Sequence, residues 1–328
     1  MHQENHTGIS EFFLLGFQNL SSFKIPFFIL IFSLYVITTT SNLFIVLLVS
    51  LSRTLHTPMY FFLGHLSLCD ILLSMNVIPN MLDVILKEGT TISLLGCLTQ
   101  LFMFALCCIA ECYILSMMSC DRYLAICNPL RYSSIMDFKM CLFLVVLSWS
   151  LGFLISIITC LLIYELEFCN RNIIDHFFCE FFPIVNLSCS DTSVVELEVS
   201  IATPFILLFP FVFLIVTYVY IFLTILGISS TMGRQKAFST CSSHLTVVCL
   251  YYGTLISIYL SPSNGYSLNI NKVTSLFYTL VTPLFNPVIY SLRNKDIRKE
   301  FNAFVREQEH GCFTIISTKI AKSKNKVH

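Results

Sequence analysis

The segment LGCLTQLFMFALCCIAECYILSMMSCDRYLAI, Leu95–Ile126, decides how this chain folds. Its first 26 residues include one charged residue, Glu111. Cys97 and Arg122 are 25 residues apart, about 37 Å along an α-helix, which is enough to cross a bilayer. A backbone that runs through lipid must satisfy its own hydrogen bonds, so we predict a membrane-spanning helix here.

Six further apolar segments lie on either side of this one. They span about Lys24–Leu51, Pro58–Ile85, Lys139–Tyr164, Glu196–Ile228, Ala237–Leu260 and Val273–Leu292. The chain is 56% hydrophobic and 12% charged, whereas soluble domains carry about 25% charged residues. We therefore predict an all-α membrane protein, a seven-transmembrane helix bundle in which prolines inside the spans kink the helices. These prolines are Pro79, Pro204, Pro210, Pro283 and Pro287.

The placement of Lys and Arg predicts how the bundle lies in the membrane. An extracellular amino terminus puts 15 of the 19 Lys and Arg residues on the cytosolic side and four outside, in line with the positive-inside rule. We therefore expect a multi-pass plasma-membrane protein with a cytosolic carboxyl terminus. Residues 1–23 would be extracellular, with a glycosylation acceptor at Asn5. Residues 24–292 would form the bundle, and 293–328 a short amphipathic cytosolic helix and a tail.

The composition gives no support to several other classes of protein. Net charge is zero and no basic stripe or nucleic-acid motif is present, so we expect no nucleic-acid partner. No pair of nucleophile and base and no set of metal ligands is visible, so we expect no enzymatic site. A channel or transporter would need polar residues along a pore or paired broken helices, which the few intramembrane charges do not supply.

Three polar residues lie at a similar depth inside three of the spans. Asn42 and Glu111 are each about 16 Å above the cytosolic end of their helices, and Asp70 is about 18 Å above. Ionisable groups inside lipid are costly and therefore often mark a functional site. Two carboxylates at one depth favour a bound Na⁺ or a shared proton near Asp70 and Glu111, and a packing cluster without an ion is the alternative. We expect no other cofactor.

Four blocks of sequence carry a family resemblance. They are Leu55–Leu63 (LHTPMYFFL), Met118–Cys127 (MSCDRYLAIC), Lys236–Leu245 (KAFSTCSSHL) and Pro283–Asn294 (PLFNPVIYSLRN). Together they resemble the odorant (olfactory) receptors of the rhodopsin-like G-protein-coupled receptor superfamily, and the third block is similar to the tetrapod-type, class II branch. The chain departs from the usual pattern at Ser41, where glycine is usual, and at Ser119 and Cys120, where alanine and tyrosine are usual.

The resemblance implies an odorant receptor that binds a small, mostly apolar volatile inside the bundle. It would activate a stimulatory, olfactory-type heterotrimeric G protein and raise cyclic AMP. At the cytosolic rim, Asp121 would pair with Arg122 in the resting state. On activation, Tyr218 and Tyr290 would join Arg122. The residues assigned to coupling are Asp121, Arg122, Tyr123, Tyr218, Asn286, Pro287 and Tyr290.

One face of the third span is a candidate ligand surface. It carries Phe104, Ala105, Cys108, Ile109 and Cys112. The resemblance places five more residues opposite: Ala202, Ile206, Tyr252, Tyr259 and Thr279. Amine receptors of this superfamily carry a carboxylate where this chain has Phe104, so a cationic amine is not the expected main ligand. The alternative is that this stripe only packs against its neighbours.

The resemblance also implies two disulfides in the long extracellular loop, which the oxidising exterior permits. They are Cys97–Cys179 and Cys169–Cys189. The run from His176 to Glu180 suggests a metal site, but a disulfide at Cys179 would remove the thiolate that zinc or copper prefers. We therefore expect no bound metal there.

Overall fold

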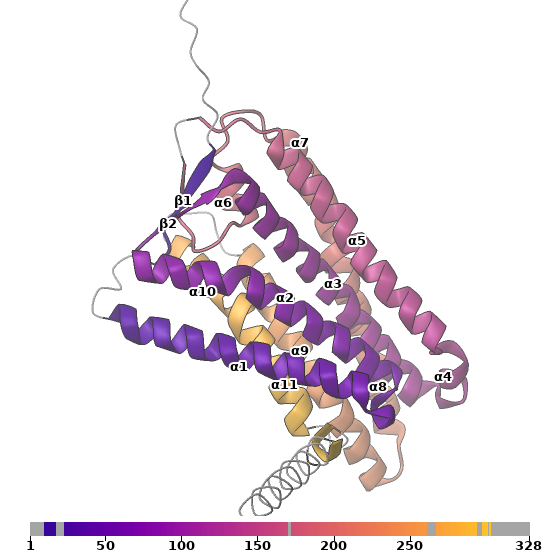
Figure 1. Ribbon diagram of the computed structural model, residues 1–328. Helices are drawn as coiled ribbons and strands as arrows, with labels where there is room; N and C mark the ends of the chain where they lie inside the picture. Colours follow the sequence, from indigo (N-terminus) through magenta and orange to yellow (C-terminus); the bar gives the residue numbers. More distant parts are fainter. Residues whose placement is uncertain are drawn as a thin grey trace, which may run out of the picture.

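The computed structural model describes residues 10–17, 23–169, 172–260, 267–293, 297–300 and 302. Most of these residues lie in long helices that run side by side as a bundle (Figure 1). Four helices are unbroken and match the predicted spans within two residues at each end. They are α1 (Lys24–Leu51), α2 (Pro58–Lys87), α3 (Leu94–Cys127) and α5 (Phe138–Tyr164). α3 is the central helix, since it packs against α2, α5 and α8.

The other three predicted spans are also helical, and two of them contain a π-helical turn. The fifth comprises α7 (Ser193–Thr203), η3 (Pro204–Leu208) and α8 (Phe209–Gly227), and the sixth is α9 (Thr231–Leu260). The seventh comprises α10 (Ser267–Leu276), η4 (Phe277–Val281) and α11 (Thr282–Arg293). The last two begin six residues before their predicted starts, because polar residues extend each helix beyond its apolar stretch.

Both π-helical turns occur beside prolines. The amide that follows each turn donates to the carbonyl five residues back, from Phe209 to Pro204 and from Thr282 to Phe277. Pro210 and Pro283 come next in the chain. A proline ring crowds the carbonyl four residues before it, and a wider turn relieves that contact.

The outer surface of the bundle is suited to lipid. Six of the described segments are long and apolar enough to cross a membrane, and α9 contributes a shorter apolar stretch, Cys241–Ile256. Large apolar side chains point outward: Ile29 on α1, Phe153 on α5 and Phe222 on α8 are 56%, 52% and 52% exposed. Such a surface is unfavourable in water and favourable in hydrocarbon. The fold is the predicted seven-helix transmembrane bundle.

A small sheet covers one end of the bundle (Figure 1). Its central strand is β1 (Glu11–Leu14), which pairs antiparallel with β2 (Thr90–Ser93) and parallel with β3 (Ile173–Ile174). Phe12 and Leu14 on β1 are fully buried. The sequence predicted no strand, because the three strands come from distant parts of the chain and each is too short to show a period.

Short helices complete the described structure. α6 (Phe181–Val185) follows β3 in the long loop, while η2 (Arg53–Leu55) and α4 (Pro129–Ile135) follow α1 and α3 at the other end of the bundle. Residues 297–300 are helical. The rest of the predicted amphipathic helix and tail lies outside the described residues, and so does Asn5.

Candidate functional site

Two disulfides fix the long loop over the end of the bundle that carries the small sheet. Cys97 at the start of α3 is bonded to Cys179, and Cys169 is bonded to Cys189, the two pairs that the resemblance implies. The backbone amide of Cys179 donates to Oε1 of Gln100 at 2.9 Å. The loop is thereby held against α3.

The loop continues inward as an aromatic layer. The ring of Phe178 lies 5.1 Å from the ring of Phe104, and Phe104 lies 5.7 Å from Tyr278 on the seventh crossing. Phe177 and Phe178 are fully buried. A predicted ligand residue, Phe104, therefore forms part of the contact between the loop and the helices.

A group of charged side chains lies beside this layer. Lys272 is 3% exposed, and its Nζ donates to Oδ1 of Asp175 at 2.5 Å and to the Gly16 carbonyl at 2.9 Å. His176 Nε2 lies 3.2 Å from Oε2 of Glu180. Burial, and secondly the charge of Lys272, lower the pKa of His176 to about 3, so its imidazole is neutral at pH 7. Burial raises the pKa of Glu180 to about 7.

Beneath the loop, the helices enclose a cavity of about 170 Å³. α3, α5, α7 and α9 contribute to its walls. Seven of the predicted ligand residues line it: Phe104, Ala105, Cys108, Ile109, Cys112, Ala202 and Ile206. The predicted stripe on α3 therefore faces an open space as well as neighbouring side chains.

Three other predicted ligand residues are placed differently. Thr279 is buried and its hydroxyl donates to the Ser275 carbonyl at 2.8 Å, so it is used within its own helix. Tyr252 packs its ring 5.0 Å from Phe211 and does not line this cavity. The side chain of Tyr259 is outside the described part of the structure.

Tyr251, which was not predicted from the sequence, lines the cavity where Tyr252 was expected. Its hydroxyl donates to the Cys108 carbonyl at 2.8 Å and lies 3.2 Å from the Cys112 sulfur. Adjacent residues on a helix point about 100° apart. The choice between the two tyrosines depends on the rotation of α9 about its own axis, which a single sequence does not contain.

Two acidic residues of the cavity wall, Glu180 from the loop and Glu198 from α7, were also not predicted as ligand residues. Oε2 of Glu198 accepts a hydrogen bond from the Thr159 hydroxyl at 3.0 Å. Glu198 is an acidic residue within the predicted fifth span, and that rare placement is a signal that could have identified it.

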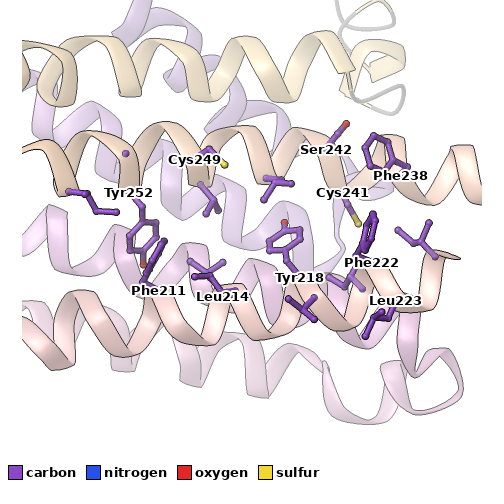
Figure 2. A pocket seen from close by; sticks show the side chains of 18 residues that line it. Phe211, Leu214, Tyr218, Phe222, Leu223, Phe238, Cys241, Ser242, Cys249 and Tyr252 are labelled. Carbon is purple, nitrogen blue, oxygen red and sulfur yellow. The ribbon is translucent and has the colours of Figure 1, made fainter.

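A second, larger hollow of about 630 Å³ lies between α8 and α9 and has an apolar lining. Figure 2 shows Phe211 and Tyr252 at one end of it and Phe222, Phe238 and Cys241 at the other. Phe222 and Phe238 are 52% and 56% exposed on the outer face of the bundle. This hollow is a surface groove that lipid can enter, in contrast to the cavity under the loop.

At the end of α3 away from the loop, Arg122 is held by its neighbour Asp121. Nε of Arg122 donates to Oδ2 of Asp121 at 2.8 Å, and Nη2 of Arg122 pairs with the same oxygen. The hydroxyl of Tyr132 on α4 donates to Oδ1 of Asp121 at 2.7 Å. The Asp121 carboxylate is fully buried and uses both oxygens in these contacts.

Three other residues assigned to coupling, Tyr123, Tyr218 and Tyr290, lie near this ion pair. Tyr218 is hydrogen-bonded to Nδ1 of His244, and the ring of Tyr123 lies 6.1 Å from that of Tyr220. The hydroxyl of Tyr290 is buried without a partner among the described residues. Among the described residues, neither Tyr218 nor Tyr290 is hydrogen-bonded to Arg122.

Deeper in the bundle, the polar residues form separate contacts. Nδ2 of Asn286, which precedes Pro287, donates to both carboxylate oxygens of Asp70, at 3.1 and 2.9 Å. Tyr278 donates to Oε2 of Glu111 at 3.4 Å. Asn42 donates to the Pro283 carbonyl at 2.9 Å. Within the described residues, Glu111 Oε1 and Asn42 Oδ1 are buried without a hydrogen-bond partner.

Comparison with known proteins gives one result. A family profile described as "Olfactory receptor" matches residues 31–308. The chain is 46% identical to Olfactory receptor 5P68 of Mus musculus over 91% of its length and 95% of that protein. It is 43% identical to Olfactory receptor 8D4 of Homo sapiens over 94% of its length and 98% of that protein. The matched residues include α2–α11, the cavity and the Asp121–Arg122 pair, and the chain belongs to the olfactory receptor family.

Proposed function

We propose that this receptor binds a small, mostly apolar volatile in the cavity under the loop and activates a stimulatory heterotrimeric G protein, raising cyclic AMP. The cavity is the observation that carries the proposal. It lies between helices, and its walls are mostly apolar with a few polar groups, as in other ligand sites of helix bundles. Its roughly 170 Å³ is small beside the 300–1,000 Å³ typical of sites for drug-sized ligands.

The proposed signal passes along α3. Cys112 lines the cavity, and Arg122 follows it by ten residues, about 15 Å along the helix. A ligand can shift the receptor toward an active conformation only by binding that conformation more tightly. We infer that the favoured conformation releases Arg122 from Asp121, so that its guanidinium can contact the G protein.

The test uses cells that express the receptor with a cyclic-AMP reporter and a panel of volatiles. Ile206→Trp fills the cavity, and Cys108→Leu narrows it. Ile201→Trp, on the lipid-exposed face of α7, is the matched control. We expect the two cavity variants to change the ranking of agonists at equal surface level, with the largest agonists losing most. Responses that fall in proportion for every agonist would show that these residues only pack.

We further propose that a Na⁺ ion or a shared proton stabilises the buried carboxylates of Asp70 and Glu111. The support is that both are fully or almost fully buried and that Glu111 Oε1 has no partner among the described residues. Solubilised receptor should unfold at a higher temperature in sodium chloride than in choline chloride, and Asp70→Asn should remove the difference. Asp83→Asn, at an exposed pair with Lys87 on the same helix, is the control. Equal unfolding temperatures in both salts would favour a proton shared by Asp70 and Glu111 over a bound Na⁺ ion.

The proposed orientation puts the amino terminus outside the cell. Asn5 would then be glycosylated, and enzymatic removal of the sugar should shift the mobility of wild type but not of Asn5→Gln. An antibody to an amino-terminal tag should bind intact cells, whereas one to a carboxyl-terminal tag should need permeabilised cells. The reverse staining pattern would refute this orientation.

A further inference from the structure

Two carboxylates line the cavity under the loop, and they come from different elements. Glu180 lies between β3 and α6, and Glu198 is on α7. Oε2 of Glu180 is 3.2 Å from His176 Nε2 and 3.5 Å from the Ser275 hydroxyl, and Oε2 of Glu198 accepts from Thr159. Among the described residues, no Lys or Arg lies within ion-pair distance of either carboxylate.

The basic side chains on the Glu180 side of the cavity do not neutralise that carboxylate. Lys272 is already paired with Asp175 and with the Gly16 carbonyl. His176 is neutral at pH 7, because its pKa lies near 3. Glu180 and Glu198 are partly buried, and a carboxylate in such a place either takes up a proton or is stabilised by an opposite charge. The cavity therefore presents acidic groups whose counter-ion is missing from the surrounding protein.

We propose that the ligand of this receptor is a small alkyl amine, bound as its ammonium ion, whose charge is balanced by Glu198 and Glu180. The inference rests on the proposed function of the cavity and specifies its ligand class. An ammonium group supplies both the positive charge and three hydrogen-bond donors. The alkyl part would contact the apolar wall formed by Leu101, Phe104 and Ile206.

Other volatile classes fit the cavity less well. A ketone or aldehyde needs a donor, and the Thr159 and Tyr251 hydroxyls already donate to Glu198 and to the Cys108 carbonyl. The Ser156 hydroxyl, which has no hydrogen-bond partner among the described residues, could donate to such a ligand, but a neutral carbonyl group would leave both carboxylates without a counter-ion. A carboxylic acid would add a third negative charge. An alcohol can donate to a carboxylate but brings no charge. From Phe104 on α3 we expected that a cationic amine would not be the main ligand. The proposal revises that expectation, because the loop and α7 supply the carboxylates that α3 lacks.

The first test compares four volatiles with one carbon skeleton: isoamylamine, isoamyl alcohol, isovaleraldehyde and isovaleric acid. In the cyclic-AMP assay, the amine should be the most potent agonist. Glu198→Gln keeps the shape of the side chain and removes its charge, and should lower amine potency roughly 10- to 100-fold, the range for hydrogen bonds to charged groups. Glu196→Gln, on the exposed side of α7, is the matched control and should leave amine potency unchanged.

The second test uses extracellular pH and Glu180. The groups that face Glu180 are His176 from the loop and Ser275 from α10, with Lys272 and Asp175 behind the imidazole. Because its pKa is about 7, Glu180 ionises between about pH 6 and about pH 8, while an alkyl ammonium stays charged as Lys does. Amine potency should therefore rise up to roughly tenfold across this window, and Glu180→Gln should abolish the rise.

The outcomes separate this inference from the proposed function. An aldehyde, alcohol or acid that activates better than the amine would refute the amine assignment while leaving the cavity as the ligand site, provided that Ile206→Trp alters that response. Amine activation that is indifferent to both Glu198→Gln and Glu180→Gln would also refute it. If neither Ile206→Trp nor Cys108→Leu changes the potency of any agonist, the cavity is refuted as the ligand site. Failure of every amine tested up to millimolar concentration counts against the inference.

Discussion

Gly152 on α5 sets how closely that helix approaches α3. A Cβ built at Gly152 would lie 3.0 Å from the Leu106 carbonyl oxygen and 3.1 Å from Leu106 Cδ1. The carbonyl belongs to the α3 backbone, so it cannot rotate away as a flexible side chain could. Gly152→Ala should therefore force the two helices apart by a few tenths of an ångström. Small residues have this role at other helix contacts in membranes.

Gly253 on α9 provides a matched control for this change. A Cβ there would have no neighbouring atom within 4 Å apart from its own helix. Both substitutions gain the same helix propensity, about 0.5–1 kcal/mol. Overpacking a well-packed interior costs about 1–3 kcal/mol. The difference in stability between Gly152→Ala and Gly253→Ala should therefore be about 1–3 kcal/mol, because the propensity gain cancels.

The measurement is the apparent midpoint of thermal unfolding of the detergent-solubilised receptor. It is monitored as the loss of the monodisperse peak in size-exclusion chromatography after heating. Gly253→Ala should unfold at or slightly above the wild-type temperature. Gly152→Ala should unfold several degrees lower, on the scale of about 2–4 °C per kcal/mol. Equal midpoints for the two variants would mean that α3 and α5 do not approach as closely as the structure has it.

Three further predictions address other parts of the molecule. Arg122→Ala should abolish the cyclic-AMP response at an unchanged surface level, because it removes the cation that Asp121 holds; a normal response would refute its role in coupling. Removing the Cys97–Cys179 bridge, which joins residues 82 apart, should cost about 4–5 kcal/mol of stability, and removing Cys169–Cys189, with a separation of 20, about 3 kcal/mol. Flow cytometry should therefore find less receptor at the cell surface after loss of the first bridge than after loss of the second. Lys272→Met should cost about 1–3 kcal/mol of stability in the same thermal assay because it leaves Asp175 and the Gly16 carbonyl without their donor. Lys87→Met, at an exposed surface pair with Asp83, should change stability by less than about 1 kcal/mol. An equal loss in both variants would contradict a stabilising role for the buried contacts of Lys272 with Asp175 and the Gly16 carbonyl.

The membrane-spanning helices could be predicted because their signal is local. A run of about 20 apolar residues has one stable backbone conformation in hydrocarbon, whatever surrounds it. For this reason the ends of α1, α2, α3 and α5 agree with the sequence within two residues. The π-helical turns of the fifth and seventh crossings were anticipated only as kinks at prolines, since their exact position depends on neighbouring helices.

The candidate site could be predicted only in part, and the errors have a common cause. Ala202 and Ile206, which the resemblance implies as ligand residues, line the cavity, whereas Tyr252 lines the outer groove and Tyr251 lines the cavity in its place. The rotation of a helix about its axis is set by all of its contacts, which a single sequence does not contain. Glu180 was named only as the end of a possible metal motif, because its approach to the cavity depends on the disulfide at Cys179.

The sequence by itself determined that this chain crosses a membrane in seven helices and that it carries the motifs of the olfactory receptor family. Both conclusions rest on apolar length and local residue identity, which need no knowledge of distant contacts. Only the tertiary structure decided that β1 pairs with β2 and β3, that Lys272 joins Asp175 to the Gly16 carbonyl, and that Glu180 and Glu198 line one cavity. These features join residues far apart in the chain, and their geometry exists only once the bundle and its loop have packed together.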